Sequence, residues 1–248
     1  MTQILRLGAD PELVPAQVVS GTTDPNWWSQ YGFVLSQLGT KESPMPLPGG
    51  IGSTIQRDGG SVELGFRPCD SSEMFLATLD QTKHLAEVMC GMPLLGVARV
   101  ELGPLLPHIY DAGMEEYYSE FGCDPDYQLQ HGELVLRDVP NQVREAQVQE
   151  CGFHLHFDIP RALLRDSPNH DGIGAAVPGI VKRIDEAIYP IYQANATISD
   201  SAWYRQRGIV RVKNYGIEYR SLGGDVYDAP YRQDIVDAAF DILSSLAA

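Results

Sequence analysis

Residues 152–158 alternate strictly between apolar and polar positions, which is the pattern of a half-buried β-strand. One face carries two phenylalanines and a leucine, and the other carries His154, His156 and Asp158. Side chains two positions apart on a strand lie about 7 Å from each other, so two imidazoles and a carboxylate project into a common space. These groups are ligands for divalent metals. A strand with polar residues facing water explains this stretch alone equally well.

Residues 217–222 and 62–66 repeat the alternation. The first segment places Glu218 and Arg220 on one face by the same two-residue period. The second segment turns three apolar residues toward a core and leaves Glu63 on the opposite face, next to a glycine. That glycine either leaves open space beside the carboxylate or marks a bulge. Further strands thus carry chemistry that matches the two histidines.

Near the N-terminus, residues 4–7 predict a short strand that runs into Asp10 and Glu12. Pro11 lies between the two acids and cannot donate to a β-ladder, so we expect this segment at a strand end or a sheet edge. The two acids point the same way if the backbone stays extended. A polar turn is the alternative.

Apolar residues at helical spacing predict four helices, and other segments predict one more strand and two loops. The helices are expected at residues 70–91, 109–121, 172–196 and 233–246, the strand at 95–101, and the loops at 20–50 and 122–127. The first loop is rich in Pro and Gly and is suited to line a substrate entrance. Strands with one polar face, backed by two or three long helices, indicate an α+β fold with a mainly antiparallel sheet. We expect a single domain over residues 1–248.

The chain is acidic, with 33 Asp and Glu against 18 Lys and Arg and a net charge of -15. Such a chain repels polyphosphate backbones, which disfavours binding to nucleic acid. The sequence has no apolar run long enough to predict a membrane span, and its N-terminus lacks the basic and apolar regions of a secretory signal. The 4 cysteines are widely spaced and predict reduced thiols of a cytosolic protein.

A second departure from the average composition is a basic stretch near the C-terminal end. It holds Arg205, Arg207, Arg211, Lys213 and Arg220. A solvated patch and a clamp for phosphate or carboxylate are both compatible with it, and the planar fork of Arg suits the clamp. The motifs GxxxxGK[ST], GxGxxG and GxSxG are absent from the sequence. Their absence disfavours a Walker-type ATPase, a Rossmann dehydrogenase and a hydrolase with a serine elbow.

Five short segments, taken in order, resemble the phage-type COOH–NH2 ligases. These enzymes are type 2 amidoligases, relatives of glutamine synthetase and of glutamate–cysteine ligase. The segments are residues 8–12, 58–64, 122–126, 152–156 and 204–220, and the likeness extends over roughly residues 8–225. The chain departs from the family pattern at residues 151–153, Cys-Gly-Phe, where the family commonly has two small residues before the histidine.

The resemblance implies a glutamine synthetase-like catalytic domain, in which a mainly antiparallel sheet forms an open funnel backed by helices. It implies ATP and two or more Mg²⁺ ions, with Mn²⁺ tolerated, and the joining of a carboxylate to an amine. The partners would be small-molecule or peptide substrates, with no nucleic acid and no membrane, and an oligomer stays open. The expected location is the cytoplasm, which is the host cytoplasm if a phage encodes the chain.

The resemblance also implies roles for individual residues. The metal ligands would be Asp10, Glu12, Glu63, His154 and Glu218. Asp10 stands where relatives often have another acid.

The remaining implied roles concern substrate and nucleotide. The catalytic residues would be His156, Arg211 and Arg220, and the nucleotide-binding residues Arg205, Arg211 and Arg220. His156 would contact substrate or nucleotide, and the arginines would hold phosphate or carboxylate oxygens.

The chemistry of such a ligase fits these residue types. A carboxylate is a poor electrophile, and its phosphorylation by ATP gives an acyl phosphate that an amine can attack. Carboxylates with Mg²⁺, together with arginines, neutralise charge as the phosphoryl group moves. Three other classes stay open: a phosphagen-type phosphotransferase, a metal-dependent hydrolase that needs no nucleotide, and a non-catalytic binding or virion-associated protein.

Overall fold

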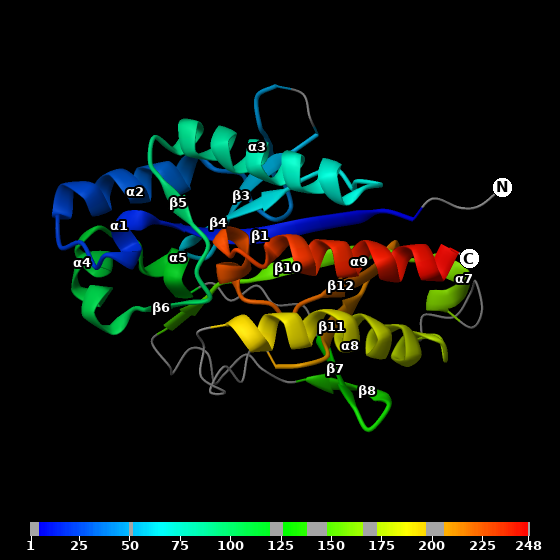
Figure 1. Ribbon diagram of the computed structural model, residues 1–248. Helices are drawn as coiled ribbons and strands as arrows, with labels where there is room; N and C mark the ends of the chain where they lie inside the picture. The colour runs from blue at the N-terminus through cyan, green and yellow to red at the C-terminus, as the bar shows by residue number, and fades with distance from the viewer. Residues whose placement is uncertain are drawn as a thin grey trace.

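The computed structural model describes residues 5–49, 52–119, 126–137, 148–165, 173–196 and 206–247. Within them, a large sheet is covered on one face by long helices (Figure 1). Each strand of the sheet pairs with its neighbours in the antiparallel direction. This arrangement confirms the α+β class and the antiparallel sheet expected from the alternating strands.

The strands follow the order β2-β3-β4-β1-β10-β12-β11-β7-β8, and β5 pairs with the end of β1. The sheet consists of β1 (Leu7–Pro15), β2 (Met45–Pro46), β3 (Thr54–Asp58), β4 (Ser61–Gly65), β5 (Leu94–Leu95), β7 (Asp126–Gln130), β8 (Glu133–Arg137), β10 (Phe153–Asp158), β11 (Ile209–Val212) and β12 (Gly216–Tyr219). A separate pair is formed by β6 (Arg99–Glu101) and β9 (Val148–Glu150). In the described part of the chain the outer strands β2 and β8 do not pair with each other, so the sheet is open.

The helices differ widely in length. They are α1 (Ala16–Val19), α2 (Pro25–Gln37), α3 (Ser72–Cys90), α4 (Leu106–Asp111), α5 (Glu115–Ser119), α7 (Arg161–Leu164), α8 (Val177–Asn195) and α9 (Arg232–Ala247), with 3-10 turns η1 (Gly103–Leu105) and η2 (Gly224–Asp228). The three longest, α3, α8 and α9, lie side by side over the sheet (Figure 1). No helix among the described residues is long and apolar enough to cross a membrane.

The core lies between these helices and the apolar face of the central strands. In β10, Phe153, Leu155 and Phe157 are fully buried, which confirms the strand expected at residues 152–158. Across the layer, the ring of Phe75 from α3 meets Phe240 from α9 edge to face, at a centroid distance of 6.3 Å. The apolar face of β10 thus anchors the strand, and its polar face is left to point the other way.

Three predicted helices formed. One of them is α8, which lies within the predicted residues 172–196 and begins at Val177. Helix α3 begins after Ser71, whose hydroxyl accepts the backbone N–H of Met74 at 3.2 Å, and it ends at Gly91 with φ 68°. These are a serine N-cap and a left-handed C-cap glycine. The last helix, α9, covers the predicted residues 233–246.

Two other predicted elements are each divided. The helix expected at residues 109–121 was wrong as a single element, because α4 ends before Gly113, which has φ 66°, and α5 follows it. The strand expected at 95–101 was also wrong, since β5 and β6 belong to different sheets. The end of the predicted helix and most of the predicted loop at 122–127 lie outside the described residues.

The placement of the N-terminal strand at a sheet edge was wrong, because β1 is central and pairs with β10 on one side and β4 on the other. Glu12 donates its backbone N–H to the carbonyl of Gly152 at 2.8 Å, on the β10 side. Successive N–H groups point to opposite sides of a strand, so Pro11 faces the β4 side. Pairing with β4 begins only at Glu12, opposite Glu63, so the missing donor of Pro11 leaves no ladder bond unmade.

The prediction of a structureless loop over residues 20–50 was wrong as well. Asp24 accepts the backbone N–H of Asn26 at 2.9 Å, and with Pro25 in the first turn it starts α2. Trp28 is fully buried and donates its indole N–H to the carbonyl of Thr22 at 2.9 Å. This segment therefore contributes a core helix as well as the loop that leads to β2.

Candidate functional site

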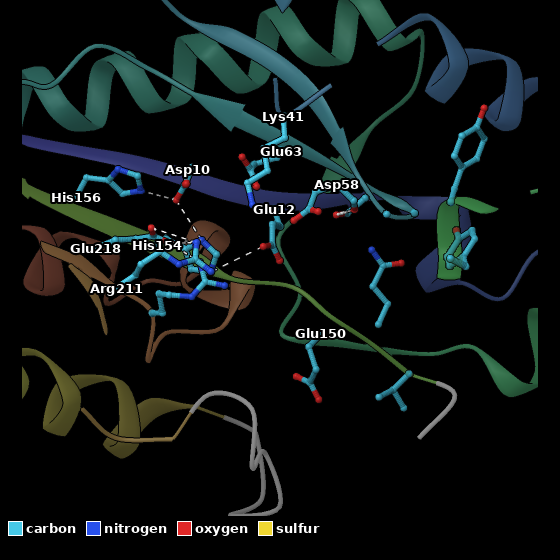
Figure 2. Close-up of a pocket in the computed structure, with 18 of the residues that line it drawn as sticks. Asp10, Glu12, Lys41, Asp58, Glu63, Glu150, His154, His156, Arg211 and Glu218 are labelled. Carbon is cyan, nitrogen blue, oxygen red and sulfur yellow. Dashed lines mark hydrogen bonds and ion pairs between the residues drawn. The ribbon is translucent and has the colours of Figure 1, made fainter. Parts of the chain in front are cut away.

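The site is built on the polar face of neighbouring strands in the middle of the sheet. Its side chains are, in strand order, Asp58 of β3, Glu63 of β4, Asp10 and Glu12 of β1, His154 and His156 of β10, Glu218 of β12 and Arg211 of β11. The register places Glu12 opposite Glu63, Asp10 opposite His154, and His156 and Arg211 each opposite Glu218. Directly opposed residues share a face of the sheet, so all of these side chains meet above it (Figure 2).

An open cavity of about 900 Å³ lies over this face. Among the described residues, its lining includes six acidic and four basic side chains, together with both histidines of β10. These residues are Asp10, Glu12, Asp58, Glu63, Glu150 and Glu218, then Lys41, Arg211, Lys213 and Arg220, then His154 and His156. The charges are partly separated. Four of the acids, Asp10, Glu12, Asp58 and Glu63, lie on β3, β4 and β1, and three of the bases surround Glu218.

The acidic side of the cavity holds a group of three carboxylates. Glu12, Asp58 and Glu63 each offer an oxygen, and these atoms lie within 4.8 Å of one another. Backbone N–H of Gly152 donates to Glu12 at 2.6 Å, and the Gln56 amide donates to Glu63 at 2.6 Å. Burial, followed by the neighbouring acids, raises the pKa of Glu63 well above its ordinary value. A cation bound among the three carboxylates would offset the repulsion that Glu63 experiences.

The centre of the site is a row formed by Asp10 and the two histidines (Figure 2). Asp10 Oδ1 lies 3.2 Å from Nδ1 of His154 and 2.8 Å from Nε2 of His156. The Tyr215 hydroxyl lies 2.7 Å from the other nitrogen of His156, and the two rings stack at 5.8 Å. His156 is thus oriented from both ring nitrogens.

These contacts shift the pKa values of the row. Burial favours neutral Asp10, but His156 and His154 outweigh it and hold the pKa of Asp10 well below its ordinary value. Burial likewise opposes the charge of His156, but Asp10 outweighs it and raises the pKa of His156 above 6.5. Asp10 and His156 therefore behave as an ion pair.

A second group of possible metal ligands overlaps this row. Asp10, His156 and Glu218 offer one ligand atom each, again within 4.8 Å of one another. His154 lies between the two groups, with Nε2 3.8 Å from Glu12 and Nδ1 3.8 Å from Glu218. The three-carboxylate group suits Mg²⁺, and the mixed oxygen and nitrogen group also suits Mn²⁺.

The basic side surrounds Glu218, which is almost fully buried. Arg220 bonds its carboxylate directly, Nη1 of Arg211 lies 3.3 Å from Oε1, and Nζ of Lys213 lies 3.6 Å from Oε2. Burial favours the neutral acid, but Arg220 above all keeps the pKa of Glu218 at about 2. Glu218 therefore stays ionised and marks the boundary between the acidic and the basic side.

The structure brings together eight of the nine residues proposed from the sequence, all of which line the cavity. These are Asp10, Glu12, Glu63, His154, His156, Arg211, Glu218 and Arg220. Arg205 lies outside the described residues. Arg207, from the same basic stretch, instead bonds the buried carboxylate of Asp185, away from the cavity lining. Which side chains hold a metal stays a prediction.

Sequence reasoning missed several residues of the site. Asp58 completes the three-carboxylate group, Tyr215 positions His156, and Glu150 and Lys41 line the cavity walls (Figure 2). Asp58 directly precedes two glycines, so the sequence indicates a turn before β4 and gives no separate sign of a metal ligand. Lys41 and Tyr215 lie far from the histidines along the chain, so no local pattern connects them. Glu150 precedes His154 by only four residues but belongs to another strand, β9.

The described cysteines do not belong to the site. Cys69, Cys90 and Cys151 are buried and form no disulfide with one another, and none of them lines the cavity. Burial raises the pKa of Cys90 to about 11, so its thiol is a weak nucleophile. Cys123 lies outside the described residues.

The fold and the site define an α+β protein with one cavity over the polar face of its sheet. Acidic side chains, two histidines and basic side chains line this cavity. No family model, no curated protein and no solved structure matches the chain.

Proposed function

We propose that the chain is an ATP-dependent ligase that joins a carboxylate to an amine through an acyl phosphate. The observation that supports this most strongly is the ordering of charge in the cavity. Three carboxylates whose oxygens lie within 4.8 Å of one another are on one side, and Arg211, Lys213 and Arg220 surround Glu218 on the other. Such a site accommodates divalent cations and phosphate oxygens next to each other.

The donor sets fit divalent cations. Glu12, Asp58 and Glu63 would hold one ion, and Asp10, His156 and Glu218 a second. The raised pKa of Glu63 reflects a group of acids that a cation would relieve. When bound, such ions neutralise phosphate oxygens and align the transferred group.

The arginines would bind the phosphate groups of the nucleotide. Arg220 and Arg211 both bond Glu218, which fixes each guanidinium at the wall of the cavity. Lys213 adds a third positive charge beside them. Glu218 thus orients the donors that would face the γ-phosphoryl group.

In the first step, an oxygen of the substrate carboxylate would attack the γ-phosphorus. An O–P bond forms, the bond to the β-phosphate oxygen breaks, and ADP leaves. The amine nitrogen would then attack the acyl carbon and lose a proton, the C–N bond forms, and the C–O bond breaks as phosphate departs. His156, held between Asp10 and Tyr215, is placed to contact the reacting groups.

The reaction needs no covalent group on the protein, which agrees with the positions of the described cysteines. We extend the proposal to the fold. An open antiparallel sheet, with helices on one face and the site on the other, is compatible with a glutamine synthetase-like funnel.

The test is ADP release with Mg-ATP and a panel of acids and amines. We expect release to require both an acid and an amine, and to be lost in Glu218→Gln. Glu186→Gln is the matched control, because Glu186 lies on α8 and its side chain is exposed. ADP release with a guanidino compound and no amide product would indicate a phosphotransferase. Activity without ATP would indicate a hydrolase, and failure to bind nucleotide would indicate a binding protein.

A further inference from the structure

A second groove opens beside the cavity and shares Asp10, Glu63 and His156 with it. The residues that line only the groove are Ala9, Gly52, Thr54, Gly65, Phe66, Arg67 and Pro68. The three shared side chains therefore form a wall that can be reached from two sides. A nucleotide in the cavity would leave the groove as a separate approach to the same reacting groups.

The strand period of β4 explains why the groove is open. Glu63 and Gly65 are two positions apart on β4 and project to the same side, while Leu64 between them is buried. Arg67 follows two residues after the end of the strand and lines the same groove. A Cβ atom at Gly65 would lie 2.7 Å from the Thr54 hydroxyl, so a side chain there would crowd the floor. The absence of one leaves a channel from the Glu63 carboxylate toward Arg67.

Among the described residues that line the groove, Arg67 is the only arginine, and no lysine is among them. Its side chain is exposed, and it forms no ion pair with the residues that the structure describes. By contrast, the two acids of the wall already have partners, since Asp10 contacts both histidines and Glu63 accepts from Gln56. The guanidinium is therefore available to a ligand, and its planar fork matches a carboxylate.

We propose that this groove binds the acid substrate, and that the substrate is a dicarboxylic acid whose second carboxylate is held by Arg67. The first carboxylate would then lie at the wall of Asp10, Glu63 and His156, next to the transferred phosphoryl group. Four residues of extended chain span at most about 14 Å, so the backbones of Glu63 and Arg67 lie no farther apart than that. The reach of both side chains shortens this gap, so a diacid with a short chain fits it. The inference rests on the proposed ligase function for the reaction, but the binding site can be tested without it.

The experiment is calorimetric binding of straight-chain diacids, and of their half-amides, to the Mg²⁺-loaded protein. Each half-amide has nearly the same size as its diacid but lacks the second charge. We expect the preferred diacid to bind wild type about tenfold more tightly than its half-amide, because one charge-assisted contact is lost. Arg67→Gln should remove that preference, and Arg67→Lys should keep part of it, since lysine retains the charge without the fork.

Arg183→Gln is the matched control, because Arg183 lies on α8 and bonds the Ser245 hydroxyl. It should keep the full preference for the diacid. Equal binding of diacid and half-amide by wild type, or a preference that survives in Arg67→Gln, would overturn the assignment of Arg67.

The two proposals fail in different ways. Diacid binding that depends on Arg67, without any ATP-dependent product, would support the groove and contradict the ligase. ATP-dependent ligation of monoacids that is unaffected by Arg67→Gln would support the ligase and contradict the groove.

Discussion

At the scale of single residues, Glu63 experiences unfavourable electrostatics on the acidic side of the cavity. Its folded-state pKa is raised by burial and by Asp10, Asp58 and Glu12. Below its ordinary pKa of 4.5 the group is protonated in both states and costs nothing. As the pH rises, the unfolded state ionises first, so the free energy of unfolding falls until the folded pKa is passed.

Glu63→Gln should therefore raise the melting temperature of the metal-free protein at neutral pH, and the gain should shrink as the pH falls toward 4.5. The amide keeps an oxygen for the bond from Gln56. The measurement is thermal unfolding in excess chelator over a pH series. A variant that is less stable than wild type at neutral pH would show that this carboxylate is stabilised by contacts within the protein.

A substitution at Arg220 tests whether the arginines bind phosphate or carboxylate oxygens in the cavity. Its guanidinium bonds Glu218 and also lies 3.9 Å from Asp126, so a lysine could not reproduce both contacts and still donate into the cavity. Arg220→Lys should lower ADP release nearly as much as Arg220→Ala, by about tenfold or more. Arg183→Lys, on α8, should have no effect. Turnover of Arg220→Lys close to that of wild type would mean that a point charge suffices there.

Glu218 tests metal and nucleotide binding together. Ligands that bind only the folded state raise its stability by mass action, so Mg-ATP should raise the melting temperature of wild type. Glu218→Gln removes the negative charge of a proposed metal ligand, which is also the shared partner of two arginines and a lysine. The substitution should therefore reduce the gain in melting temperature. Glu186→Gln should respond as wild type does. Identical gains in wild type and Glu218→Gln would remove Glu218 from the binding site.

At the scale of elements, Asp185 joins a helix to the strands that present the basic side. Its carboxylate, on α8, accepts from the backbone N–H of Gly208 at 2.8 Å and from the Tyr219 hydroxyl at 2.9 Å, and it also bonds Arg207. Gly208 and Tyr219 lie at the start of β11 and the end of β12. This buried carboxylate therefore helps to hold in place the two strands that carry Arg211 and Glu218.

Asp185→Ala should lower the free energy of unfolding by about 3 kcal/mol, because it leaves buried donors without an acceptor. Glu186→Ala, at the next position but exposed, should change it by less than about 0.5 kcal/mol. Urea unfolding measures both. A loss for Asp185→Ala no larger than that of its neighbour would mean that α8 packs without this anchor.

The elements that the sequence predicted well are those whose pattern is long and unambiguous. β10 alternates over its whole length, and α3 combines helical spacing with a serine cap and a glycine stop. β1 was predicted at an edge because Pro11 cannot donate a backbone hydrogen bond. A central position is possible because pairing with β4 begins only at the next residue, Glu12. α2 was not predicted, because Asp24 and Pro25 are as typical of a turn as of a helix start. The burial of Trp28, which the sequence does not show, identifies the segment as a core helix.

At the scale of the whole molecule, strand order and register determine which side chains meet in the cavity. Neither can be predicted from a local pattern in the sequence. The polar faces of β10, β4 and β12 could each be predicted from alternation. That Glu12 faces Glu63, and that His156 faces Glu218, depends on pairings between segments far apart in the chain. Asp58 joins the carboxylate group only because β3 and β4 bring its turn beside β1.

The central claim is that the substrate carboxylate is activated by ATP, and hydroxylamine trapping tests it most directly. Hydroxylamine is a small nucleophile that converts an acyl phosphate into a hydroxamate. With Mg-ATP and a suitable acid but no other amine, the protein should form hydroxamate in amounts that depend on ATP and on the acid. Glu218→Gln should form none, and Glu186→Gln should form as much as wild type. Hydroxamate that forms without ATP, or ADP that accumulates across a broad acid panel with no hydroxamate, would contradict the ligase mechanism.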